Sequence, residues 1–445
     1  MSGGFAAAIA AWRAEQRVRS AFVCEGMPLE ALGRWNMAER EIAHATGGFF
    51  RIIAVRTSSS DTGIDGEAQP FILQPEIGIL GFLARRGAAG PELLVQAKTE
   101  PGNEGAVQLA PSFQCTPSNY TARHGGTPAP FFEHFAEPPP GGVISDLRQS
   151  EQGTRFLGKF NRNMVVELPD ALAPQEPGPA WRWLDAAALR GLLVADNVLN
   201  TDARSVLVST PWRYWAGGEP FARWAGTDGF GAALLHSYRQ AVEDDAAAWL
   251  LTRRAAVSIT NKRLALTDLP GWRMADGALA PIVPGSFAVR GYRVQARDRE
   301  VPNWEQPLVD SAGEGQITLI CQRHGGVLRV LLRARAEPGL GNRVEIAASV
   351  QVAPGSAPEA GFEAELTEAA AGAQVHLACH QSEEGGRFHR DGNAYRIVEL
   401  DAAMPLARPA AFRWVTLRQL EALCTTPGLV TNEARSAASL LLSLA

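Results

Sequence analysis

The chain has 445 residues, of which 46% are hydrophobic and 20% are charged, which is the composition of an ordinary globular protein. At roughly 150 residues per domain, this length allows two or three domains. Lys and Arg total 42 against 47 Asp and Glu, so the net charge of −5 gives no electrostatic reason to expect nucleic acid or an anionic membrane surface as a partner.

The N-terminus predicts an amphipathic helix and not a secretion signal. Residues 1–20 lack a basic start, and Arg13 and Glu15 interrupt the apolar run. We therefore expect residues 1–45 to form a helical segment. No run in the sequence approaches the ~20 apolar residues that a membrane span needs. The five cysteines include no Cys-x-x-Cys pair, which argues against a disulfide framework or a structural zinc site and fits a reducing cytoplasm.

Two short apolar strands, which we expect a tight, glycine-containing turn to connect, lead into a polar segment. It reads QAKTEPGNEGAVQLAPSFQ at residues 96–114, and the charged octet QSEQGTRF follows further on at residues 149–156. Gln96, Lys98 and Glu100 alternate, so on a strand they would share one face. A polar face beside strands this apolar indicates either the floor of a pocket or a solvated face of the sheet.

The same motifs occur a second time, in the same order, which indicates an internal duplication. Residues 96–114 align without a gap with RARAEPGLGNRVEIAASVQ at residues 333–351, and the octet returns as QSEEGGRF at residues 381–388. A Trp-containing segment and an Ala-Arg-Ser triplet then follow in both halves. Asp185 and Thr416 stand just after the matching tryptophans, where the N-cap of a helix belongs.

The duplication divides the chain into four predicted parts. After the helical segment 1–45, copy one spans residues 46–215 and copy two spans residues 285–445. Residues 216–284 carry apolar residues at helical spacing and predict a largely helical connector. Because each copy mixes strands with a few helices, the predicted class is α+β. Two equal halves also predict pseudo-symmetric packing, with an equivalent pocket in each half.

Two stretches of copy one carry a family resemblance. VQAKTEPGNEGAVQLAPSFQCTPSNYT at residues 95–121 and LRQSEQGTRFLGKFNRNMVVE at residues 147–167 resemble the NDP-hexose 2,3-dehydratases of deoxysugar biosynthesis. The resemblance covers nearly the whole chain, because Glu-Pro-Gly and the octet recur in copy two. It implies two tandem Nudix-like domains and a homodimer.

The resemblance also implies an activity. The family removes water across carbons 2 and 3 of a sugar nucleotide of the type dTDP-4-keto-6-deoxyglucose, which gives a 3,4-diketo-2,6-dideoxy product. No metal or redox cofactor is implied, and a separate 3-ketoreductase is expected to consume the product. The metal-binding Nudix motif, Gly-x5-Glu-x7-Arg-Glu-x-x-Glu-Glu, does not occur in the sequence. The alternative is a non-catalytic nucleotide-sugar binding protein built on the same duplication.

This dehydration sets clear chemical requirements. The proton on carbon 3 is acidic only because carbon 4 is a ketone, so a base must lie near carbon 3 and donors must face the carbon 4 oxygen, where enolate charge builds. The departing hydroxide needs an acid. The diphosphate needs Arg, Lys or backbone N–H groups, and the nucleobase needs an aromatic or guanidinium face.

Polar residues of copy one are the candidates for these roles. We expect Lys98 to stabilise the enolate, and Tyr120 to donate to the keto oxygen or to the leaving hydroxyl. Glu100, Glu151 and His124 are the alternative bases. The expected substrate-binding residues are Gln96, Gln108, Gln114, Ser118, Asn119, His124, Arg155, Arg162 and Asn163.

Copy two replaces several of these residues. Lys98 becomes Arg335 and Tyr120 becomes an alanine, which predicts that copy two kept binding or structure and lost chemistry. The two glutamates at the positions of Glu100 and Glu151 are retained, so these carboxylates can also have a structural role common to both copies. The expected pocket residues of copy two are Arg335, Glu337, Gln351, Glu383 and Arg387.

Overall fold

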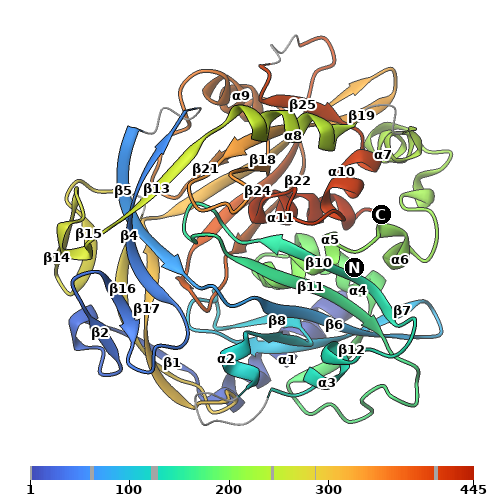
Figure 1. Ribbon diagram of the computed structural model, residues 1–445. Coiled ribbons are helices and arrows are strands. Elements are labelled where there is room, and N and C mark those ends of the chain that lie inside the picture. The colour runs from blue at the N-terminus through green and yellow to red at the C-terminus, as the bar shows by residue number, and fades with distance from the viewer. Residues whose placement is uncertain (1–2, 61–64, 122–128, 242–244, 286, 405–408) are drawn as a thin grey trace.

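The computed structural model describes residues 3–60, 65–121, 129–241, 245–285, 287–404 and 409–445. In these residues the strands form four sheets, with helices between and beside them (Figure 1). This mixture of elements confirms the α+β class. No helix in the described ranges is long and apolar enough to cross a membrane.

The main sheet of copy one is built around a hairpin of β6 and β7. Beyond their turn the two strands separate, and the short strands β9 and β8 pair with them in the gap. β11 pairs parallel with β6 and antiparallel with β10, while β12 pairs with the other edge of β7. The bounds are β6 Gly78–Arg86, β7 Pro91–Thr99, β8 Val107–Pro111, β9 Phe113–Cys115, β10 Val143–Ser150, β11 Phe160–Glu167 and β12 Trp181–Asp185.

The main sheet of copy two repeats these pairings in the same order. β18 and β19 form the hairpin, β21 and β20 fill the gap, β24 pairs parallel with β18, and β22 and β25 lie at the two edges. The strand pairing therefore confirms the duplication. The bounds are β18 Glu314–His324, β19 Val327–Ala336, β20 Val344–Ala347, β21 Val350–Val352, β22 Gln374–Ser382, β24 Gly392–Leu400 and β25 Phe412–Val415.

Two matching helices, α5 (Thr201–Val208) and α11 (Asn432–Leu442), pack together between the main sheets (Figure 1). The expected N-caps are confirmed, since Asp185 accepts a bond from the backbone N–H of α4 and Thr416 forms a capping box at α10. The other helices are α1 Gly3–Ser20, α2 Pro117–Tyr120, α3 Phe132–Ala136, α4 Ala186–Gly191, α6 Trp212–Ala216, α7 Gly229–Arg239, α8 Ala246–Ala256, α9 Phe362–Ala371 and α10 Leu417–Cys424.

Residues 1–45 and 216–284 are less helical than the sequence analysis expected. Helix α1 is followed by three short strands, and helix α8 is followed by three more. These strands are short and several have mostly exposed side chains, so they lack the buried apolar alternation that identifies a strand in a sequence. Their bounds are β1 Val23–Met27, β2 Trp35–Met37, β3 Glu41–His44, β13 Ile259–Leu264, β14 Trp272–Ala275 and β15 Ala278–Pro281.

The two halves exchange one of these strands each. β1 of the first half pairs with β16 (Phe287–Gln295), and β13 of the second half pairs with β4 (Arg51–Ser59). β4 and β16 form matching hairpins with β5 (Asp65–Leu73) and β17 (Asn303–Ser311). In Figure 1 the yellow-green β13 runs beside the blue β4. These correspondences place the start of the repeated units at α1 and α8, earlier than residues 46 and 285.

Each octet packs on the Glu-Pro-Gly turn of the other copy. The backbone N–H of Gly102 donates to the carbonyl oxygen of Gly385 at 2.8 Å. The matching N–H of Gly339 donates to the carbonyl oxygen of Gly153 at 2.7 Å. The two motifs that reveal the duplication in the sequence are therefore partners across the pseudo-symmetric interface.

Gly102→Ala tests this contact. A Cβ at residue 102 would lie 1.4 Å from the carbonyl oxygen of Phe388, which is backbone and cannot move by itself. We expect the free energy of unfolding, measured with denaturant, to fall by about 2 kcal/mol or more. Gly372→Ala is the matched control, because a Cβ there meets nothing within 4 Å and φ is −93°. Equal losses in the two variants would contradict the contact.

Candidate functional site

A cavity of about 280 Å³ lies where the two copies meet. Copy one supplies side chains from β7, β9, β11 and the start of α5. The chain around β2 and β3 adds an aromatic wall, and the second half adds its octet and the loop between β16 and β17. Because both halves line it, the cavity exists only in the assembled pair.

One wall of the cavity carries three residues that the sequence analysis selected. Lys98 Nζ lies 3.4 Å from Glu100 Oε1 and donates to the carbonyl oxygen of Gln114 at 3.1 Å. The side-chain amide of Gln114 donates to Glu100 Oε1 at 3.2 Å. Glu100 Oε2 is buried and has no hydrogen-bond partner among the described residues. Such an orphan oxygen is costly in a fold, and it is free to accept a proton from a ligand.

Further carboxyl groups line the cavity, and among them are Asp202 and Glu384, which the sequence analysis did not select. Asp202, on α5, is only 3% exposed, and burial together with the charge of Glu151 raises its pKa well above the usual range. Glu384 comes from the copy-two octet. Burial raises its pKa to about 7, Arg387 opposes the shift, and Glu100 adds to it. A comparison of the two octets could have identified Glu384, because the first octet has Gln152 at this position and the second has a carboxyl group.

Cationic side chains face these carboxyl groups. Burial lowers the pKa of Lys159 to about 8, and its ammonium group donates to the carbonyl oxygen of Glu76. The guanidinium of Arg387 lies over the ring of Phe50, 4.2 Å from the centroid. Arg299, from the β16–β17 loop, donates to the carbonyl oxygen of Thr99 at 3.3 Å. Such a group of cations can hold a diphosphate.

An aromatic wall lies beside the cations. The rings of Trp35 and Phe50 lie 4.9 Å apart, as do those of His44 and Phe49. Trp304 lines the cavity from the start of β17, and its indole N–H donates to Gln306 Oε1 at 3.0 Å. Flat ring faces of this kind suit a nucleobase.

The structure brings only part of the predicted site together. Of the copy-one candidates, Lys98, Glu100, Gln114 and Asn119 line the cavity. His124 lies outside the described residues. The remaining candidates line other surfaces or the interior, and they are Gln96, Gln108, Ser118, Tyr120, Glu151, Arg155, Arg162 and Asn163.

Tyr120 and Ser118 pack away from the cavity. The ring of Tyr120 stacks on Phe132 at 4.3 Å in an apolar cluster, because an aromatic side chain at the end of a short helix gains more from this burial than from solvent. Ser118 donates from its N–H and its hydroxyl to the two carboxylate oxygens of Glu76, at 2.9 and 2.7 Å. Neither residue lines the cavity.

The polar residues of β11 and β7 are also engaged elsewhere. Arg162 forms a two-pronged ion pair with Asp146, with both bonds at 2.6 Å, near the surface. Asn163 donates to the hydroxyl of Ser205 at 2.7 Å in the interior. Gln96 lies half-buried on β7, opposite residues of β8 and β12.

Three other candidates lie at the contact between the copies. Gln108 donates to the hydroxyl of Ser382. Glu151 accepts from Asn161 at 2.6 Å and from Asn432 at 3.1 Å, which supports a structural role for this glutamate. Arg155 crosses with its octet to the second half, where its guanidinium lies 4.0 Å from the centroid of the Phe287 ring.

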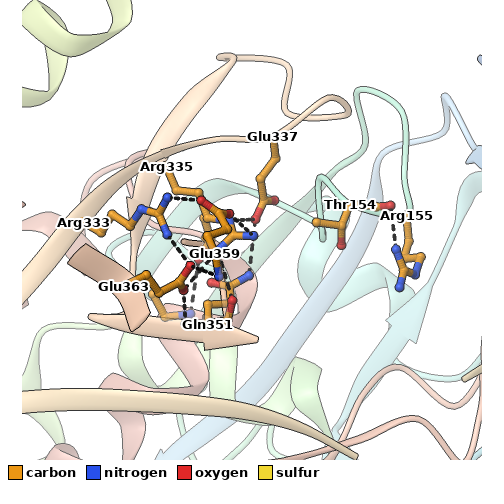
Figure 2. Close-up of polar contacts among 10 residues, drawn as sticks. Thr154, Arg155, Arg333, Arg335, Glu337, Gln351, Glu359 and Glu363 are labelled. Carbon is orange, nitrogen blue, oxygen red and sulfur yellow. Dashed lines mark hydrogen bonds and ion pairs between the residues drawn. The ribbon is translucent and has the colours of Figure 1, made fainter. Parts of the chain in front are cut away.

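The equivalent place in copy two is filled with ion pairs. Arg335 lies 3.3 Å from Glu337 and 3.3 Å from Glu359, and Arg333 lies 2.6 Å from Glu359 and 3.0 Å from Glu363. Figure 2 shows this cluster together with Gln351, whose carbonyl oxygen accepts from Arg335 at 3.1 Å. The protein's own carboxylates therefore neutralise the arginines that replace the polar residues of copy one.

The two other residues predicted for this second pocket lie apart from the cluster. Glu383 is buried and accepts from Asn393 and Tyr395, at 2.5 and 3.1 Å. Arg387 lines the copy-one cavity, because the octet that carries it crosses to the other half. The sequence could not reveal this crossing, since an octet on a loop can reach either copy.

A family model, NDP-hexose 2,3-dehydratase, matches residues 6–210 and 243–441. The first matched segment begins within α1 and the second begins three residues before α8, close to where the structure begins its two repeated units. The agreement extends the duplication to the exchanged strands.

Three curated relatives are each 33% identical to the chain, and each is named dTDP-4-dehydro-6-deoxy-alpha-D-glucopyranose 2,3-dehydratase. The protein from Saccharopolyspora spinosa matches over 97% of this chain and 90% of its own length. The corresponding shares are 96% and 94% for Streptomyces violaceoruber and 96% and 88% for Amycolatopsis orientalis.

Solved structures match parts of the chain. An Ap4A hydrolase from C. elegans covers 24% of this chain and 81% of its own, with 18% identity and a TM-score of 0.16. A Nudix hydrolase from M. Smegmatis covers 29% and 83%, with 26% identity and a TM-score of 0.18. Because the family model and the three relatives span nearly the whole chain, the chain belongs to the NDP-hexose 2,3-dehydratase family.

Proposed function

We propose that this protein is a lyase that removes water across carbons 2 and 3 of an NDP-4-keto-6-deoxyhexose in deoxysugar biosynthesis. The product is a 3,4-diketo-2,6-dideoxyhexose nucleotide. The curated relatives are named for a dTDP sugar of this type, and we assign the same substrate class to this chain. The observation that carries the proposal is one cavity with buried carboxyl groups, two lysines and an aromatic wall.

The distribution of these groups suggests how the substrate lies. The sugar would occupy the end beside Lys98 and Glu100, which are 5% and 4% exposed. The diphosphate would lie against Lys159, Arg299 and Arg387, and the nucleobase against the aromatic wall. This arrangement would put the reacting carbons beside two almost fully buried side chains, where charge stabilisation is stronger than in water.

Glu100 and Lys98 would perform the first step. Lys98 Nζ lies 3.4 Å from Glu100 Oε1, and Glu100 Oε2 has no protein partner among the described residues. Glu100 would take the proton from carbon 3, and Lys98 would stabilise the negative charge that develops on the carbon 4 oxygen. A non-catalytic binding protein, the alternative, would have no need of this pair of buried groups.

The partners expected for this enzyme follow from the chemistry of its product. A 1,2-diketone is reactive, so we propose that a 3-ketoreductase consumes it. The homodimer and the cytoplasmic location remain predictions from the sequence.

Incubation with dTDP-4-keto-6-deoxyglucose in heavy water tests the proposal. We expect the wild-type protein to form the diketo product, detected by NMR and mass spectrometry, and Lys98→Gln to lower kcat about 100-fold because an oxyanion loses its stabilising charge. The Kd for dTDP should stay within about threefold, since the nucleotide contacts remain. Tyr120→Phe is the control and should retain the wild-type rate. Tight binding of unchanged substrate by the wild type would instead support the binding protein.

The pH dependence of nucleotide binding tests the role of Lys159. With its pKa lowered to about 8, this lysine is charged at pH 7 and largely neutral at pH 9.5, so it attracts a diphosphate only at the lower pH. The phosphates of dTDP are already ionised at pH 7. We expect the Kd of the wild type to rise about tenfold between these pH values, and that of Lys159→Gln to stay nearly constant. Parallel profiles for the two proteins, measured by calorimetry, would contradict this role.

A further inference from the structure

The two octets differ at two positions, and both differences affect the cavity. The first octet has Gln152 and Thr154 where the second has Glu384 and Gly386. Because each octet crosses to the other copy, Glu384 and Gly386 line the copy-one cavity. Figure 2 shows Thr154 on the loop beside the ion pairs of copy two. Each octet thus carries residues suited to the half on which it packs.

Gly386 leaves room for the carboxyl group of Glu384. A Cβ at residue 386 would lie 2.7 Å from Glu384 Oε1 and 3.7 Å from Glu100 Oε1. A threonine, which the first octet has here, would therefore displace the carboxyl group. The two differences act together, since one adds a carboxyl group and the other leaves room for it close to Glu100.

The two carboxyl groups have different surroundings. Glu100 lies 3.4 Å from the ammonium of Lys98, and its Oε2 has no hydrogen-bond partner in the described part of the chain, which leaves this oxygen available to act as the base. The largest influence on Glu384 is burial, which raises its pKa to about 7, so a large share of this group carries a proton at neutral pH. One cavity thus holds a proton acceptor and a proton donor close together, as an elimination requires.

We infer that Glu384 is the catalytic acid of the dehydration, supplied by copy two to the copy-one cavity. This inference rests on the proposed function. After Glu100 takes the proton from carbon 3, the enolate electrons re-form the carbon 4 carbonyl and make a double bond between carbons 2 and 3. The bond from carbon 2 to its oxygen breaks, and that oxygen takes the proton of Glu384 and leaves as water. The resulting enol tautomerises to the diketone, and solvent restores the two carboxyl groups.

Glu384→Gln tests the assignment, because glutamine is the residue that the first octet has at this position. We expect the variant to exchange the carbon 3 hydrogen of the substrate for deuterium in heavy water at close to the wild-type rate, since Glu100 and Lys98 are intact. Product formation should fall at least about 100-fold, because the hydroxide lacks its acid. The Kd for dTDP should stay within about threefold of the wild-type value.

Gly386→Ala supplies a second test that leaves the glutamate in the chain. The atom that the new Cβ meets first is the end of the flexible Glu384 side chain, so the fold can accept the change while the carboxyl group moves. As in Glu384→Gln, we expect exchange of the carbon 3 hydrogen to be retained while product formation falls at least about tenfold. Thr154→Ala is the matched control in the first octet, and it should leave both rates unchanged.

Two results would overturn the inference. Product formation at the wild-type rate in Glu384→Gln would show that no proton from Glu384 is needed. Loss of both exchange and product formation, with dTDP binding intact, would show that Glu384 is needed to form the enolate. Its role would then differ from that of an acid for the leaving hydroxide. If the wild-type protein itself neither exchanges nor dehydrates the substrate, the proposed function fails, and this outcome is distinct because it needs no variant.

Discussion

The reciprocal contact between each octet and the opposite half is the constraint on which the rest of the structure depends. Two buried arginines reinforce it. Arg204 is fully buried and donates to the carbonyl oxygen of Ser382 at 2.8 Å, and Arg435, which is 1% exposed, donates to that of Ser150 at 2.7 Å. Burying a guanidinium is costly unless it is hydrogen-bonded, so separating the halves would expose or orphan both groups. The duplicated units behave as one folded body.

This crossing also explains how two similar halves give one open cavity. Lys98 in copy one and Arg335 in copy two make the same bond to a backbone carbonyl, at 3.1 Å in each case. The longer, forked guanidinium also reaches Glu359 and Glu363, which fill the place beside it. In copy one the corresponding space beside Lys98 stays open, and the octet of copy two brings a carboxyl group and an arginine into it. The chemistry of the site therefore needs both copies, because the cavity beside Lys98 is completed by side chains of the second half.

The sequence predicted the parts of this arrangement that depend on local pattern. The Glu-Pro-Gly turn, the octet and the N-caps at Asp185 and Thr416 are short motifs with direct backbone roles, so their recurrence revealed the duplication. The exchanged strands left a weaker signal. Leu29-x-x-Leu-x-x-Trp35 returns as Leu266-x-x-Leu-x-x-Trp272, and a search of residues 1–45 against residues 216–284 would have found it.

The site itself was only partly predictable. Lys98, Glu100 and Gln114 meet because strand alternation and pairing bring them together. Tyr120 and Arg162 lie outside the cavity, and the sequence pattern could not show this, because an aromatic ring can stack on a neighbour and an arginine can pair with a local aspartate without changing that pattern. The part played by Glu384 depends on which half its octet packs against, and that is a property of the tertiary structure alone.

A crystal structure of the protein with a dTDP-sugar substrate analogue would test the central claim most directly. The account predicts that the diphosphate binds Arg387 and that the carbon 2 oxygen of the sugar lies within hydrogen-bonding distance of Glu384, so that both halves contact one ligand. A sugar bound beside Arg333 and Arg335, or one held in the cavity by copy-one residues alone, would contradict it.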